Sequence, residues 1–420
     1  MSDLVEPTDP TPSPPQAVPA TISQRIDSLD VLRGFAVLGI FVMNIQTFAM
    51  FSHTYFNPTH YGMWDGVDYY VWYLSHVLAD QKFMTIFSLL FGAGIVLFTS
   101  RKEEIGKSAR AFHYRRMGWL IAFGLFHGYL IWEGDILFLY GVCGLWVYLL
   151  RNVRPSRLLV VGLLVLAIGS GLAMMSGLSS PYWPEESRES FIQDSWQPPP
   201  ESLAEATSAY GNGTFWEQVK HRAPLTLVWQ TFVLFFWGVW RAGGLMLVGM
   251  ALYKLGVVSA GRSIKTYASM IALGALAGIP VVIYGIQEKF AHDWEPFYSF
   301  FVATQYNYWA SLLVSGAYIG VVMLACKTDA LRHLMRPFAA AGGMAFSNYI
   351  AQSLVGSFIF YGTGLGYYNE IGRVGQIVIV VSVWIVQLIV SPIWLKHFRF
   401  GPLEWVWRSL TYKQRQSFRI

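Results

Sequence analysis

Charged side chains are scarce in this sequence. Aspartate, glutamate, lysine and arginine make up 13% of the residues, whereas hydrophobic residues make up 54%. Because a soluble domain carries about 25% charged residues, this composition excludes an ordinary soluble protein and predicts a chain that crosses a membrane several times. The net charge of +5 does not predict nucleic-acid binding, since the basic residues are concentrated in a few loops, as membrane topology requires.

Cysteine and metal-binding patterns are nearly absent as well. The two cysteines, Cys143 and Cys326, lie in separate apolar runs, which is typical of small buried residues and not of a disulfide framework. The sequence has no cluster of histidine and cysteine and no His-Glu-x-x-His, so we expect no metal site. No Walker-type lysine follows Gly92-Ala-Gly94, which indicates helix packing there.

The N-terminal segment lacks basic residues. Residues 1–21 contain six of the 19 prolines, three acidic residues and no lysine or arginine. A secretory signal peptide needs a basic start and an apolar centre, so this segment does not fit one. We predict a disordered cytoplasmic tail over residues 1–24.

Long apolar runs fill most of the remaining chain. A helix needs about 20 apolar residues to cross roughly 30 Å of hydrocarbon. The runs predict an all-α, polytopic transmembrane bundle of about ten spans. Their approximate positions are 31–51, 83–100, 115–132, 135–150, 156–177, 225–253, 264–286, 297–326, 338–361 and 374–396.

The segments that follow these runs alternate in charge. Basic residues cluster after every second run, and acidic residues cluster in the loops between those basic segments. Cytoplasmic loops carry an excess of lysine and arginine. The alternation therefore predicts that both termini are cytoplasmic.

The runs form two membrane regions separated by one longer polar loop. We assign residues 25–177 to an N-terminal membrane region and 178–223 to an extracytoplasmic loop. Residues 224–396 form a C-terminal membrane region, and 397–420 a basic cytoplasmic tail. The loop is too short for a separate domain.

Two stretches depart from simple spans. Residues 66–80 are amphipathic and rich in tyrosine and tryptophan, which favours the outer membrane interface. The run 225–253 is longer than a straight span needs, and Arg241-Ala-Gly-Gly244 interrupts it. We expect a tilted, kinked or broken helix there.

The first span carries two polar residues on one face. Arg33 and Asn44 are eleven residues apart, which is about three helical turns and roughly 16 Å along the axis. Arg33 is either a topology anchor that reaches the headgroups or a contact for donor phosphates. Asn44 either bonds a neighbouring helix or stabilises the oxyanion of an acyl group.

A first candidate for acid–base chemistry lies in the first outer loop. His53 and His60 are followed by Asp65, and a nearby carboxylate can hold a histidine in the required tautomer. His53 can join a site with Asn44 only if the first helix ends near Met50. Solvated loop histidines are the simpler interpretation.

A second candidate is formed by His127 and Asp135. His127 lies within the membrane on the outer side, where an ionisable group is unusual. Asp135 begins the next span, so its simpler role is to cap that helix. Together the two side chains are an alternative acid–base pair.

Arg241 is the deepest cation in the sequence. An unpaired guanidinium there is costly, so we expect a carboxylate, with Asp135 the first to test, or an anionic ligand beside it. Helix packing is the expected role of the other intramembrane polar residues. These are Gln305, Asn307, Ser347, Asn348 and Gln352.

Several separated motifs resemble the YeiB-like family of bacterial inner-membrane proteins, a family described as a domain of unknown function. The resemblance covers most of residues 25–412 and implies a multi-pass protein of the bacterial inner membrane. The motifs are Arg25-Ile-Asp-Ser-Leu-Asp-Val-Leu-Arg-Gly34, Phe87-Ser-Leu-Leu-Phe-Gly-Ala-Gly94, Gly134-Asp-Ile-Leu137, Gly343-Met-Ala-Phe-Ser-Asn-Tyr349 and Gly401-Pro-Leu-Glu-Trp-Val-Trp-Arg408.

The N-terminal part is also similar to the transmembrane acyltransferase superfamily, which includes heparan-α-glucosaminide N-acetyltransferase. This resemblance implies an acyl-CoA donor on the cytosolic side and an envelope acceptor, a sugar or a lipid, on the far side. It places Arg33 at the donor entrance, Asn44 in the active site and His53 as the catalytic histidine, with His127 as the substitute. The interval from Asn44 to His53 is slightly short for that pattern.

The leading hypothesis is an integral membrane acyltransferase of the cell envelope. His53 or His127 acts as general base, Asn44 supports the oxyanion, and Arg33 holds donor phosphates. One alternative is a transporter or lipid-handling protein that recognises an anionic substrate through Arg241. Another is a non-catalytic assembly component. The lipid bilayer, the donor and the acceptor are the expected partners, a homodimer is left open, and neither a metal nor nucleic acid is expected.

Overall fold

The structure is a computed structural model that describes residues 22–104 and 108–420. Helices make up most of this part of the chain, and its only β-type pairing is an isolated bridge between Phe398 and Arg419. The all-α prediction is therefore confirmed. Most of the predicted tail at 1–24 lies outside the described residues, and the first helix begins at Ile22.

The α-helices follow one another with short connections. In chain order they are α1 (Ile22–Ala49), α2 (Val67–Leu78), α3 (Lys82–Glu104), α4 (Ala109–Leu130), α5 (Leu137–Val147), α6 (Pro155–Ser179), α7 (Glu185–Phe191), α8 (Pro200–Thr207), α9 (Phe215–Val228), α10 (Val239–Lys254), α11 (Ile264–Leu273), α12 (Ile279–Ala291), α13 (Thr304–Lys327), α14 (Asp329–Gly343), α15 (Ala345–Phe360), α16 (Arg373–Leu395) and α17 (Pro402–Tyr412).

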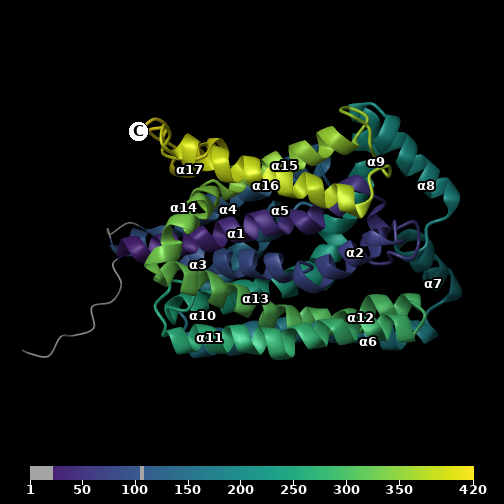
Figure 1. Ribbon diagram of the computed structural model, residues 1–420, viewed down its shortest axis with the longest axis horizontal. Helices are drawn as coiled ribbons and strands as arrows, with labels where there is room; N and C mark the ends of the chain where they lie inside the picture. The colour runs from purple at the N-terminus through teal and green to yellow at the C-terminus, as the bar shows by residue number, and fades with distance from the viewer. Residues whose placement is uncertain (1–21, 105–107) are drawn as a thin grey trace, which may run out of the picture.

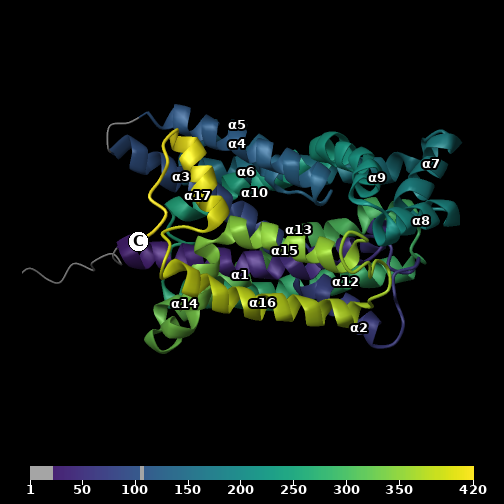
Figure 2. The ribbon, with the colours of Figure 1, turned by 90° about the horizontal axis from the view of Figure 1, so that it is seen from above.

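The long helices run side by side along the longest axis of the molecule (Figure 1). The start of α1 and the C-terminal residue lie at the same end, which we call the terminal end, whereas α7 and α8 lie at the opposite end, the α7–α8 end. Figure 2, turned by 90°, again shows the C-terminal residue and the start of α1 at one end and α7 and α8 at the other. The predicted basic loops contact one another. Lys254 donates a hydrogen bond to the carbonyl of Arg151 (2.5 Å), and Lys327 donates one to the carbonyl of Arg262 (3.0 Å).

The core is built around α1 and α10. α1 packs against α3, α14, α15 and α16, and α10 packs against α3, α5 and α6. In its most apolar stretch 78% of the α1 residues are buried, compared with 17% for α16. The peripheral helices therefore present apolar side chains outward, as lipid-facing helices do.

Seven helical segments of the described chain are long and apolar enough to cross a membrane. They support a membrane protein, and they are Ser28–Ala49, Val67–Ser100, Pro155–Tyr182, Phe215–Lys254, Ile264–Ala291, Tyr298–Lys327 and Arg373–Leu395. The other three predicted runs are helical but differ from full apolar spans. α4 begins with several basic residues, Leu137–Leu150 is a shorter apolar helix, and the run 338–361 is divided at Met344. The count of ten and the cytoplasmic termini stay predictions.

Two glycines set the contact between α1 and α14. A Cβ added to Gly34 would lie 1.9 Å from the carbonyl oxygen of Phe338, and one added to Gly342 would lie 1.8 Å from that of Asp30. No side chain fits at either position, so the two backbones touch. Gly342 and Gly34 therefore allow a close contact between the two helices.

The predicted irregularity in the run 225–253 is present, but at a different place. The helix stays continuous through Arg241 and instead forms a π-helical stretch, Trp229–Gly238, between α9 and α10. A π-helical stretch widens the turn locally and is a known cause of bending. The predicted interfacial segment 66–80 forms α2, which packs against α12 and α16.

Candidate functional site

His127 and Asp135 meet at the turn between α4 and α5. His127 occupies the last turn of α4, and its Nδ1 lies 2.8 Å from Oδ1 of Asp135. The other oxygen, Oδ2, accepts a hydrogen bond of 2.7 Å from the backbone N–H of Phe138 in the first turn of α5. Both side chains are 1% exposed. One carboxylate therefore caps the start of α5 and contacts an imidazole, and the role of the pair in acid–base chemistry stays a prediction.

A third residue, Ser353, completes a line of hydrogen bonds. Its Oγ lies 2.9 Å from Nε2 of His127, on the opposite side of the ring from Asp135. Ser353 comes from α15, 226 residues away in sequence, and is 2% exposed. The order Asp135–His127–Ser353 is that of a catalytic triad, in which a carboxylate orients a histidine and the histidine faces a hydroxyl.

Aromatic rings enclose this line of residues. Trp132 lies edge-on to His127 at 6.1 Å between ring centres, and Tyr349 lies 5.3 Å away. Phe48 of α1 stacks on Trp132 at 4.5 Å. The imidazole is therefore shielded from water on at least two sides, which strengthens electrostatic interactions at its nitrogen atoms.

Two hydrogen-bond donors near His127 have no partner among the described residues. They are Nε1 of Trp132 and Nε2 of Gln230. The Gln230 amide nitrogen lies 3.0 Å from the point where a Cβ on Gly128 would sit, beside His127. Buried donors without acceptors are costly, and donors of this kind serve elsewhere to bind a developing oxyanion.

Asn44 lies on the stretch of α1 that packs against α15. Gln352 donates to the carbonyl of Val37 (3.0 Å), and Gly356 packs on Phe48. Asn44 itself is half-buried. The structure records no hydrogen bond from its side chain to any described residue and no contact with His127.

His53 is held by its own loop. α1 ends at Ala49, as a site with Asn44 would need, but Nε2 of His53 lies 3.0 Å from both the carbonyl oxygen and Nδ1 of His60. Burial lowers the pKa of His53 to about 4, so the ring is neutral at physiological pH. Among described contacts, no carboxylate lies against it, and the expected pairing with Asp65 is not found. Of the two histidines, only His127 is oriented by an acid.

Arg33 lies in the first half of α1, towards the terminal end. It pairs with Asp30 one turn earlier, and both side chains are 30% exposed. Arg116 of α4 lies between the rings of Phe98 and Trp407, at 5.2 and 4.6 Å from the ring centres. The structure does not bring Arg33 to His127.

A cavity opens near this basic region, between α4 and α17. Its volume is about 580 Å³, and the described residues that line it include no acid. The lining is mostly apolar, with basic side chains among it. It consists of Arg115, Trp119, Trp405, Val406, Ser409, Leu410, Lys413, Gln414 and Arg415.

Arg241 is fully buried, but without the expected partner. Its Nη1 donates to the carbonyl of Tyr308 (2.8 Å), and Nη2 donates to the hydroxyls of Thr85 (3.0 Å) and Ser311 (2.6 Å). The expected contact with Asp135 is not found. Neutral oxygens on α3 and α13 satisfy most of the guanidinium instead, and they hold three helices together.

A buried polar network lies one helical turn from these contacts. Asp80 accepts hydrogen bonds from Tyr55 (2.5 Å) and Asn307 (2.7 Å). The same Asn307 amide accepts from Nζ of Lys82 at 2.6 Å. Asn307, which we expected only to pack helices, therefore links a buried acid to a buried cation.

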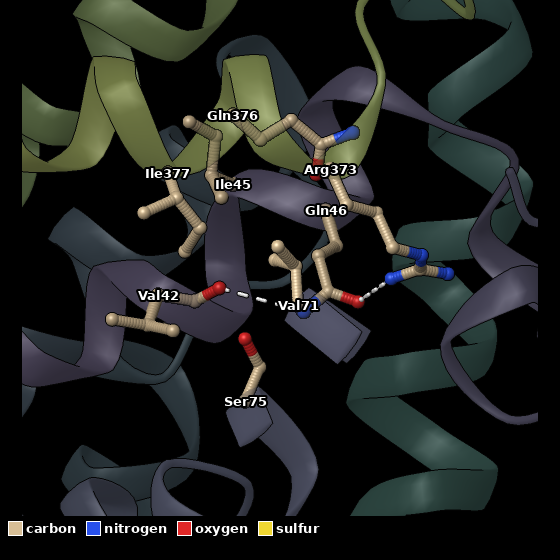
Figure 3. Close-up of a pocket in the computed structure, with 8 residues that line it drawn as sticks. All are labelled: Val42, Ile45, Gln46, Val71, Ser75, Arg373, Gln376 and Ile377. Atoms are coloured by element: carbon tan, nitrogen blue, oxygen red, sulfur yellow. Dashed lines mark hydrogen bonds between the residues drawn. The ribbon is translucent and has the colours of Figure 1, made fainter. Parts of the chain in front are cut away.

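A further buried cation, Arg373, anchors α16 on α1. It donates to the side chain of Gln46 (2.7 Å) and to the carbonyl of Gly62 (2.9 Å), as Figure 3 shows for the Gln46 contact. The adjoining pocket is lined by apolar and polar residues in equal number and has no room for a water-sized molecule. These contacts of Arg373 hold α16 against α1.

Comparison with known proteins gives relatives along nearly the whole chain. It is 28% identical over 416 residues to the uncharacterized protein YeiB of Escherichia coli (strain K12), which covers 93% of this chain and 97% of that protein. It is 29% identical over 411 residues to the uncharacterized protein YxaH of Bacillus subtilis (strain 168), with 94% and 96% covered. No solved structure matches.

A family match covers the C-terminal part. Residues 252–414 match the family described as "Protein of unknown function (DUF418)". Ser353 lies inside this region, whereas His127 and Asp135 lie outside it. The similarity of the N-terminal part to transmembrane acyltransferases stays a prediction. The full-length relatives and the family match together confirm the resemblance to the YeiB-like family that the motifs predicted.

Proposed function

We propose that this protein is a membrane acyltransferase in which His127 is the general base. The observation that carries this proposal is the buried hydrogen bond between His127 and Asp135. Asp135 accepts a hydrogen bond from Nδ1–H of His127, which leaves Nε2 as the nitrogen that takes a proton from an attacking hydroxyl or amine. The carboxylate then stabilises the imidazolium that forms.

The unpartnered donors supply the second requirement of acyl transfer. Attack on a thioester carbonyl places negative charge on its oxygen, and fixed donors in a dry site stabilise that charge strongly. The Trp132 ring lies 6.1 Å from the ring of His127, Gln230 Nε2 lies near Gly128, and neither donor has a partner among the described residues. We assign them, rather than Asn44, to the oxyanion. Asn44 stays a candidate for orienting the acyl carbonyl.

The basic cavity at the terminal end suits the donor. Coenzyme A carries phosphates and an adenine ring, and arginine side chains bind phosphate oxygens. Arg115, Lys413 and Arg415 surround an apolar space that contains two tryptophans. Arg115 and His127 are twelve residues apart on α4, roughly 18 Å along the helix. The thioester has to extend over that distance, and the acceptor approaches from the α7–α8 end.

An assay of thiol release tests the proposal. The purified full-length protein, in detergent or nanodiscs, is given acetyl-CoA and longer acyl-CoA donors with an extract of envelope sugars and lipids. We expect acceptor-dependent release of free coenzyme A that is lost in His127→Ala. His397→Ala, which changes an exposed histidine at the end of α16, is the matched control. Absence of transfer with every donor, or full activity of His127→Ala, would overturn the proposal.

A transporter for an anionic substrate is the second candidate. It is favoured by the polar network at Asp80, which includes Lys82. Arg241 bonds Thr85, one turn from Lys82 on α3, and the bonded groups include a single carboxylate. Flux of a labelled anion into proteoliposomes, lost in Arg241→Gln while thiol release stays absent in the wild type, would favour this function.

A further inference from the structure

Ser353 has a local partner and does not need His127 to satisfy its hydroxyl. Its Oγ lies 3.3 Å from the carbonyl of Tyr349, four residues earlier on α15. A serine inside a helix commonly bonds this way. The 2.9 Å contact with Nε2 of His127 is shorter and comes from another part of the chain. The hydroxyl is therefore placed at the nitrogen that the proposed mechanism uses as base.

Three features together distinguish this arrangement from an ordinary buried hydrogen bond. The acid, the imidazole and the hydroxyl follow in the order that activates a nucleophile. All three side chains are 1–2% exposed. The two donors described above, on Trp132 and Gln230, lack partners among the described residues.

We propose that the Ser353 hydroxyl is the nucleophile that carries the acyl group as an ester between donor and acceptor. This inference rests on the proposed function. It divides transfer into two steps and makes Ser353 a catalytic residue from the DUF418 region, which acts with His127 and Asp135 from the N-terminal half.

The chemistry balances in both steps. In the first, Nε2 of His127 takes the proton of Ser353 Oγ, and Oγ bonds to the carbonyl carbon of the thioester. The carbon–sulfur bond breaks, and the leaving thiolate receives the proton from His127. In the second, His127 takes a proton from the acceptor hydroxyl or amine, which attacks the ester. The bond from Oγ to the acyl carbon breaks, and Ser353 regains the proton.

A covalent intermediate suits the proposed function, in which donor and acceptor approach from opposite ends. The donor cavity lies near the terminal end, and we place the acceptor route at the α7–α8 end. With an ester on Ser353, the thiol leaves before the acceptor arrives, so both substrates need not be bound together. The burial of the three side chains keeps water from the ester, so transfer is favoured over hydrolysis.

Detection of the ester tests the inference directly. The full-length protein is mixed with acetyl-CoA without acceptor, quenched in acid, and analysed by intact mass and peptide mapping. We expect a mass increase of one acetyl group on the α15 peptide, removed by hydroxylamine and absent in His127→Ala. An acetyl group on another residue, or none during active transfer, would overturn the inference.

Variants of α15 give a second readout. Ser353→Ala should lose the adduct and reduce transfer by at least about 1,000-fold, and Ser353→Cys should form a thioester adduct instead. Ser357→Ala is the matched control, because its hydroxyl lies one turn further on the same helix and bonds the carbonyl of Ile131 at 3.4 Å. Thermal unfolding of each variant checks folding.

The transfer rates of Ser353→Ala and of the wild type distinguish the role of Ser353 from the acyltransferase function. If Ser353→Ala transfers acyl groups at the wild-type rate, the inference fails and the acyltransferase function stands, with the acceptor attacking the thioester directly. If the wild type transfers no acyl group, the function itself fails.

Discussion

The two histidine regions of this molecule differ in where their partners come from. His53 is held by His60, seven residues away in the same loop. His127 is held by Asp135 across a helix turn and faces Ser353 from a helix 226 residues away. A loop that holds its own histidine needs no tertiary structure to do so. The contact of His127 with Asp135 is also local, but its contact with Ser353 requires the complete fold, and this difference favours His127 as the candidate functional residue.

Substitution of each histidine in turn should give the largest difference in the rate of acyl transfer. We expect His127→Ala to reduce acyl transfer by about 10³–10⁴-fold, since it removes the general base and the partner of Ser353. His53→Ala should change the rate by less than about 3-fold, because no acid orients His53. Thiol release measures both. The reverse ranking would move the site to the first outer loop.

Substitution of Asp135 should give the next largest effect. Asp135→Asn keeps a side-chain oxygen for the N–H of Phe138 but removes the charge that orients His127. We expect transfer to fall by about 10²–10³-fold, with helix α5 still capped and stability lowered by less than about 1 kcal/mol. Asp135→Ala should add the loss of the cap. Equal activity of Asp135→Asn and wild type would mean that the carboxylate only caps the helix.

The unpartnered donors should give an intermediate effect. Gln230→Leu removes a buried amide near Gly128, and we expect transfer to fall by about 10–100-fold while thermal stability is unchanged or slightly higher. Gln305→Leu is a useful contrast, since the amide of Gln305 already bonds Phe301 and Ser170. That variant should lose stability and keep catalysis. A rate effect of the same size in both would argue against a specific oxyanion contact.

The smallest expected effect concerns pH and His53. Burial lowers its pKa from 6.5 to about 4, so the folded protein binds this proton less readily than the unfolded chain. Its contribution to stability is complete above about pH 6.5 and is lost as the pH falls towards 4. His53→Gln should therefore reduce the drop in melting temperature between pH 7 and pH 5. An unchanged drop would show that His53 is solvated.

Sequence and structure agree where the information is local. The helices follow the apolar runs, because hydropathy over about 20 residues reports directly on burial in lipid. His127 and Asp135 were paired correctly, because a short helical turn brings together residues eight positions apart. The break at Met344 was missed because the apolar run was interpreted as one span, although Gly342-Gly343 just before it is typical of a turn.

Long-range partners were not predictable in the same way. Ser353 lies on a helix with several other serines, and no pattern within α15 sets it apart. Arg241 was expected beside a carboxylate, yet Thr85, Ser311 and a backbone carbonyl satisfy it. Hydroxyls and carbonyls are present on every helix, so their pairing with a distant cation depends on helix rotation and depth, which hydropathy does not report.

The carboxylate of Asp135 links folding to chemistry in a way that has an evolutionary consequence. One of its oxygens caps the start of α5, and the other contacts Nδ1 of His127. A substitution that damages the orientation of His127 without an equivalent hydrogen-bond acceptor also frays the start of α5. Selection for a stable protein therefore removes many of the variants that would disable the site, even in lineages where the reaction itself is under weak selection.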